Sequence, residues 1–173
     1  SGASATSAIL SNIVEGLIRL VFFLAYIWLI GLMPDVRRVF AYHGAEHMTV
    51  KAHEEGLPLE TPYIRRFSTA HPRCGTAFLL TVMLVAILVF ALLGRPSLEW
   101  RILSRIIMLP LIAGIAYELI RFSGLHLNNP LVQIISAPNL LLQKLTTREP
   151  DDSQIEVAVH AMNTVLAADE GRP

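Results

Sequence analysis

The sequence is short of cysteine and of charge, and each scarcity excludes a class of protein. Its single cysteine, Cys74, cannot form a disulfide within the chain, so a disulfide-stapled secreted domain is excluded. Charged residues make up 16% of the 173 positions, whereas soluble domains usually carry about 25%. The 14 basic and 14 acidic residues balance, so no general attraction to nucleic acid is expected.

Long apolar runs take the place of the missing charges. Residues 75–94 contain no charged side chain, and this length is enough for an α-helix to cross about 30 Å of hydrocarbon. Residues 9–34 and 102–120 form two further apolar runs, each with two charged side chains. We therefore expect an all-α integral membrane protein with about three transmembrane helices. The small polar residues 1–8 are expected to be a linker or disordered.

The distribution of lysine and arginine predicts an orientation. Basic residues concentrate in the segment 35–74 and recur in the tail 121–173, whereas none precedes the first apolar run. Loops rich in lysine and arginine stay on the cytoplasmic side of the membrane. We therefore expect a helical loop 35–74 and the tail 121–173 in the cytoplasm, with the N-terminus outside.

The tail is expected to be helical and amphipathic. Residues 130–145 are apolar but too interrupted to span a membrane, which favours an interfacial or packed helix. Further on, Ser153 and Glu156 have the spacing of a capping box. Apolar residues then recur at helical spacing, which predicts an amphipathic helix over 152–168.

The segment "YHGAEH", residues 42–47, carries a pattern typical of metal sites. At about 100° per residue, His47 lies about 40° and Glu54 about 20° from His43 around a helix, with Glu46 about 60° to the other side. Two imidazoles four residues apart can bind one Zn²⁺. H-x-x-E-H is also the inverted zinc-hydrolase motif, in which the glutamate is the general base.

A third metal ligand has to come from outside this pair, and the sequence leaves two sources open. Glu54 is one source, on the same helix. The other is "HPRCG", which offers His71 and Cys74. If the apolar runs on either side of the loop pack together, His71 and Cys74 meet His43 and His47. Each residue taken alone is more often structural, but their clustering within 43–74 favours a metal.

Three further residues are candidates. Glu118 lies near the cytoplasmic end of the third run, where an intramembrane carboxylate is costly unless it is paired or functional. It either pairs with an arginine, such as Arg121 or Arg66, or faces the histidines as a ligand or proton acceptor. Arg66 and Arg73, with Arg65, could hold an anionic group such as a lipid phosphate; the simpler reading is positive-inside anchoring.

The blocks "RRVFAYHGAEHMTVKAHE", "RRFSTAHPRCGTAFLL" and "LLQKLTTREPDDSQIEVAV" resemble the YqhQ-like family of bacterial integral membrane proteins. That family is uncharacterised and is suggested to contain metal-dependent enzymes. The resemblance implies a place in the bacterial cytoplasmic membrane and ligands at His43, His47, His71 and Cys74, with Glu46 beside them. It also implies an N-terminal family region that this chain lacks.

These observations leave three hypotheses for function. The first is a membrane-embedded hydrolase that uses zinc, or another divalent metal, to act on a lipid-like substrate or a membrane peptide, with Glu46 as the base. The second is a non-catalytic scaffold, in which the His/Cys cluster holds a structural metal or a hydrogen-bond network. The third is one component of an oligomeric transporter. The expected partners are membrane lipids, with a second copy of the chain as an open alternative.

Overall fold

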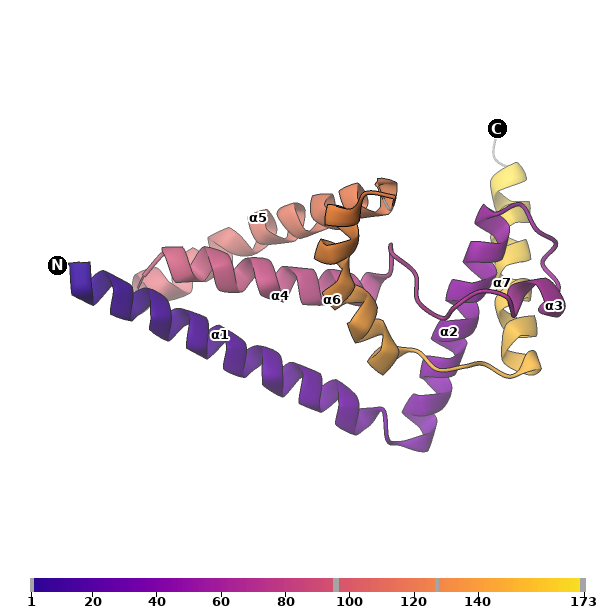
Figure 1. Ribbon diagram of the computed structural model, residues 1–173, viewed down its shortest axis with the longest axis horizontal. Coiled ribbons are helices and arrows are strands. Elements are labelled where there is room, and N and C mark those ends of the chain that lie inside the picture. Colours follow the sequence, from indigo (N-terminus) through magenta and orange to yellow (C-terminus); the bar gives the residue numbers. More distant parts are fainter. Residues whose placement is uncertain (1, 95–96, 127, 172–173) are drawn as a thin grey trace. The chain divides into compact units, whose positions relative to one another are not determined.

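The computed structural model describes residues 2–94, 97–126 and 128–171, and the regular elements in these ranges are all α-helices (Figure 1). The all-α prediction is confirmed. The helices are α1 (Gly2–Ile30), α2 (Pro34–Glu54), α3 (Thr61–Ile64), α4 (Gly75–Leu92), α5 (Leu98–Leu125), α6 (Pro130–Thr146) and α7 (Asp152–Glu170).

Three of these helices are long and apolar enough to cross a membrane: Thr6–Ile30 within α1, Gly75–Leu92 and Leu98–Leu125. Their apolar side chains are largely exposed, among them Phe22 at 71% and Leu92 at 81%. Such surface is stable in contact with lipid and costly in water. The prediction of a membrane protein with three spanning helices is confirmed.

The predicted boundaries of the first span need correction. The helix already begins at Gly2, so residues 2–8 are not a linker; alanine and serine are compatible with helix, and alanine is the best helix former. The helix ends at Ile30 rather than at residue 34, because Pro34 begins the next helix. Proline is favoured there, since the first helical N–H has no partner within the helix.

The third span is longer at both ends than predicted. It was expected over 102–120 and extends over Leu98–Leu125, through Pro110. At 1.5 Å per residue its 28 residues are about 42 Å long. That length matches the roughly 40–45 Å of a bilayer that includes its headgroup regions.

The chain divides into two compact units. The first contains residues 1–26 and 75–139, and the second contains residues 27–74 and 140–173. In the first unit α4 packs against α5, and Asn12 of α1 donates hydrogen bonds to the carbonyls of Phe90 and Gly94, at 3.0 and 2.8 Å. These bonds satisfy carbonyls at the C-terminal end of α4, which have no partner within the helix.

In the second unit α2 packs against α3 and α7 (Figure 1). Their common core contains Ala45, Met48, Ala52, Ile64 and Ile155, all fully buried. The core residues of α2 recur at intervals of three and four, so they form one face of the helix. The apolar face predicted for the tail helix thus packs against α2.

The N-terminal cap of α7 differs from the prediction. The capping box is formed by Asp151 and Gln154, two residues before the expected pair Ser153 and Glu156. The Asp151 carboxylate accepts the Gln154 N–H at 2.9 Å, and the Gln154 side-chain oxygen accepts the Asp151 N–H at 2.9 Å. Asp151 also accepts the Ser153 hydroxyl at 2.6 Å, so the serine supports the cap without forming it.

Candidate metal centre

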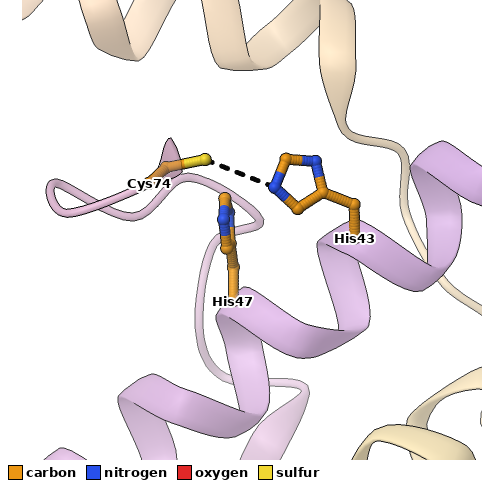
Figure 2. Close-up of side chains that lie close together, drawn as sticks. All are labelled: His43, His47 and Cys74. Carbon is orange, nitrogen blue, oxygen red and sulfur yellow. Dashed lines mark hydrogen bonds between the residues drawn. The ribbon is translucent and has the colours of Figure 1, made fainter. Parts of the chain in front are cut away.

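Two histidines of α2 face the same direction. His43 and His47 are four residues apart, which places them on one face of the helix. Their ring centroids are 4.3 Å apart, with an angle of 65° between the ring planes. Figure 2 shows both rings beside Cys74, which the chain brings in from the segment that precedes α4.

Backbone carbonyls fix the orientation of both rings. His43 Nδ1 donates to the carbonyl of Thr146 at 2.9 Å, and His47 Nδ1 donates to the carbonyl of Thr69 at 2.6 Å. In a neutral imidazole, the nitrogen opposite the N–H carries a free lone pair. Each Nε2 atom is therefore the acceptor. Metal-ligating histidines have this same arrangement, in which the other ring nitrogen donates to an oxygen.

Cys74 completes a group of three potential metal ligands. One ligand atom from each of His43, His47 and Cys74 lies within 4.8 Å of the other two. Cys74 Sγ lies 3.3 Å from His43 Nε2, and two such ligands on a tetrahedral Zn²⁺ would be about 3.6 Å apart. His47 is 5% exposed and Cys74 is 6% exposed. The separation of Cys74 Sγ and His43 Nε2 is therefore compatible with a shared metal ion.

The thiol and the imidazole influence each other. The hydrogen bond with Cys74 raises the pKa of His43 above its ordinary value, against the effect of burial, and the Thr146 carbonyl acts in the same direction. The cause is that both partners stabilise the protonated ring. Cys74 and His43 therefore form a hydrogen-bonded pair, with 3.3 Å between sulfur and nitrogen.

His71 lies nearby but has other partners. Its ring centroid is 5.7 Å from that of His47. The Arg73 N–H donates to its Nδ1 at 3.2 Å, and its Nε2 faces the Glu54 carboxylate at 3.4 Å. Burial lowers the pKa of His71, although Glu54 opposes that effect. Both ring nitrogens are occupied, so His71 does not join the three ligands as the structure stands.

Glu54 is directed to this second histidine and to an arginine. Besides His71, it forms an ion pair with Arg73 at 2.5 Å. Glu54 thus lies next to the candidate ligands, as its position on the helix predicts, but its carboxylate is not one of the three converging atoms.

A buried glutamine holds the segment that carries Cys74. The Gln143 side chain accepts the His71 N–H at 2.6 Å and donates to the His71 carbonyl at 2.8 Å, with no exposed surface. The pair of bonds reproduces a backbone pairing and fixes the turn 71–74. Sequence reasoning did not single out Gln143, because a polar residue in an interrupted apolar helix has no distinctive pattern.

Gly44 allows the chain after α6 to approach α2 closely. A Cβ at this position would overlap the carbonyl oxygen of Arg148, and the Arg148 N–H donates to the Phe40 carbonyl at 2.9 Å. This contact lies two residues after Thr146, whose carbonyl accepts the hydrogen bond from His43. The three sequence blocks "YHGAEH", "HPRCGT" and "LTTREP" therefore lie together. Hydrogen bonds to backbone carbonyls hold much of this arrangement in place.

Glu46 occupies a different face of α2. It is exposed and, with Tyr42, lines a groove of about 340 Å³ between α2 and α7. Apolar side chains, including Val50 and Met162, make up most of the groove. Glu46 thus faces the groove, whereas His47, the next residue in the sequence, is buried. The charge of Glu46 contributes to the raised pKa of His43.

The other candidates have local partners. Glu118 pairs with Arg121 on α5 at 3.6 Å, which is one of the two predicted outcomes. Arg66 lies over the ring of Tyr63, 5.1 Å from its centroid. Arg73 pairs with Glu54.

Comparison with known proteins agrees with the family resemblance of the motifs. The model of a family described as "Protein of unknown function (DUF1385)" matches residues 2–168. The chain is 35% identical over 153 residues to "Uncharacterized protein YqhQ" of Bacillus subtilis (strain 168); the match covers 88% of this chain and 48% of that protein. The chain thus spans about half the length of this relative. No solved structure matches it. The chain therefore belongs to the DUF1385 family.

Proposed function

We propose that the protein is a zinc-dependent hydrolase of the bacterial cytoplasmic membrane, with His43, His47 and Cys74 as its metal ligands. The observation that carries the proposal is the pair of Nδ1 hydrogen bonds to backbone carbonyls. These bonds place the proton of each ring on Nδ1 and leave Nε2 as the metal-binding atom. A metal would take the place of the hydrogen bond between Cys74 and His43. Two imidazoles and a thiolate are ligands that suit Zn²⁺.

The number of ligands favours catalysis over a purely structural metal. Structural zinc sites are closed by four protein ligands, whereas catalytic sites use three and keep one position open. The nearest further imidazole, His71, is bound to Glu54 and to the Arg73 N–H. A zinc ion with an open position acidifies water and polarises the oxygen of a substrate.

The groove between α2 and α7 supports an apolar substrate. Its lining is mostly aliphatic, and Glu46 and Tyr42 supply polar groups at its edge. Glu46 is the proposed general base, because its exposed carboxylate lines the groove and its charge acts on His43. An acyl chain or the apolar side chains of a membrane peptide would fit such a surface.

The proposed orientation places the site on the cytoplasmic side. The segment 35–74 and the tail carry most of the lysines and arginines of the chain, which supports an external N-terminus.

A second candidate function is a metal-free scaffold, and one observation favours it. The Cys74 thiol and His43 already satisfy each other by a hydrogen bond at 3.3 Å. In that case the cluster fixes the turn 71–74 against α2 and has no reaction to perform.

Metal analysis of the full chain purified in detergent tests the proposal. We expect one equivalent of zinc, lost in His43→Ala, His47→Ala and Cys74→Ala but retained in His53→Ala. His53 is the matched control because it is an exposed histidine of the same helix. Zinc content at background in the wild type, after incubation with Zn²⁺, would refute the metal site and leave the scaffold.

Two further measurements test the thiolate ligand and the catalytic role separately. Cobalt substitution should give a thiolate-to-cobalt absorption band that disappears in Cys74→Ala. Glu46→Gln should retain its zinc and lose turnover of fluorogenic lipid esters or membrane peptides. Full turnover in Glu46→Gln would remove the glutamate from the mechanism.

A further inference from the structure

A second polar site lies within the first unit, among the apolar spans. Two adjoining cavities share Asn12, Glu15, Phe90 and Arg105. The larger has a volume of about 120 Å³ and also includes Arg19; the smaller also includes Arg101. We call this pair of cavities the arginine notch. It lies where the first part of α1 meets the end of α4 and the beginning of α5.

The charges of the notch do not balance. Its described lining residues carry three arginines, Arg19, Arg101 and Arg105, and one carboxylate, Glu15. Arg19 pairs with Glu15 at 3.6 Å. Neither Arg101 nor Arg105 forms an ion pair with a residue that the structure describes; Arg105 lies over the Phe90 ring, 5.6 Å from its centroid. Two arginines are therefore in excess over the described carboxylate.

The other polar groups of the notch are already used. The Asn12 amide donates to the carbonyls of Phe90 and Gly94, and the Ser104 hydroxyl donates to the Arg101 carbonyl at 3.1 Å. These bonds stabilise the walls and supply no counter-charge. Arginine within a membrane span is costly unless it is paired or can reach the interface, so a ligand with negative charge would stabilise the notch.

The position of the arginines along α5 indicates where such a ligand would lie. With α5 centred in the bilayer, its first roughly 6 Å fall in the headgroup region. Arg101 is three residues after Leu98, about 4.5 Å along the helix, and Arg105 is about 10 Å along it. Arg101 therefore starts from the headgroup region, and Arg105 starts about 4 Å inside the hydrocarbon. The long side chain of an arginine at this depth can extend to the level of the lipid phosphates.

We propose that the arginine notch binds an anionic phosphate group, presented by the headgroup of a phospholipid. The planar guanidinium matches phosphate oxygens with two parallel hydrogen bonds. The two excess arginines favour a lipid with net negative charge, such as phosphatidylglycerol, over zwitterionic phosphatidylcholine. This site is independent of the candidate metal centre, which lies in the other unit.

Native mass spectrometry of the full chain with each lipid tests the proposal. We expect the wild type to retain phosphatidylglycerol in preference to phosphatidylcholine. The double variant R101Q/R105Q should lose at least about ten-fold in retention, because two charge-assisted hydrogen bonds are removed. Arg121→Gln is the matched control, since Arg121 is on the same helix but pairs with Glu118; it should retain the lipid as the wild type does.

The remaining outcomes also decide. Equal retention of both lipids by the wild type overturns the proposal without relying on the fold of any variant, and so does full retention by a double variant with wild-type helicity. Inorganic phosphate identifies the source of the ligand. If phosphate alone raises the melting temperature of lipid-free wild type but not of R101Q/R105Q, and phosphatidylglycerol is not retained, the headgroup assignment is overturned in favour of a soluble phosphate.

Discussion

Replacing Gly44 by alanine is the sharpest test of how the metal centre is held. A Cβ at this position would overlap the carbonyl oxygen of Arg148, and would lie 3.1 Å from the Thr69 side chain. The first of these neighbours is backbone, so it cannot rotate away as a side chain would. The chain from Thr146 to Arg148 has to move away from α2, and Thr146 is the residue whose carbonyl orients His43.

Two opposing effects set the size of the loss. Alanine in place of glycine favours a helix by about 1 kcal/mol. Overpacking costs about 1–3 kcal/mol, and loss of the hydrogen bond from Arg148 to Phe40 costs about 0.5–1.5 kcal/mol. The net result is a destabilisation of about 0.5–3.5 kcal/mol. Zinc affinity should fall about 10–100-fold, as it does when the partner of a ligating histidine is disturbed.

Hydrogen exchange read by mass spectrometry measures the destabilisation, because it reports the opening of α2 and α7 separately from the spans. Competition with a chromophoric chelator measures the zinc affinity. Gly114→Ala is the control: Gly114 lies inside helix α5 with no atom within 4 Å of an added Cβ, so α2 and α7 should exchange as in the wild type. If Gly44→Ala slows exchange in α2 and leaves zinc affinity unchanged, the proposed contact with Arg148 does not hold the site.

Three further predictions concern other contacts. Gln143→Leu should leave the N–H and the C=O of His71 unpaired, at about 1–3 kcal/mol for each group, and faster exchange of the turn 71–74 would report the loss. The hydrogen bonds from Ser153 and from a backbone amide lower the pKa of Asp151. The contribution of Asp151 to stability is therefore present above the unfolded pKa of about 3.9, and it is lost as the pH falls through the lower folded pKa. Acid titration of α7 helicity should show this step in the wild type and not in Asp151→Asn. Asn12→Ala removes two hydrogen bonds to the end of α4, each worth about 0.6 kcal/mol between membrane helices, and unchanged exchange of the last turn of α4 would contradict it.

Local sequence determined the secondary structure and the membrane class. The length of the apolar runs exceeds what a soluble core requires, and the helix that carries His43 and His47 fixes their common face by its period alone. The apolar face of α7 was likewise predictable from spacing. Errors fell at helix ends, where alternatives differ by a single hydrogen bond: Asp151 rather than Ser153 caps α7, and Pro34 begins α2 rather than ending the first span.

The third candidate ligand was decided by tertiary structure. From the sequence, Glu54 on the same helix and the segment with His71 and Cys74 were both open as the source of this ligand. The fold directs Glu54 to Arg73 and His71, and brings the Cys74 sulfur to His43. These choices depend on Gln143, on the Thr146 carbonyl and on the space left by Gly44, which lie far apart in the chain. Periodicity describes one helix at a time, whereas the meeting of distant segments follows from packing and backbone hydrogen bonds that no local pattern records.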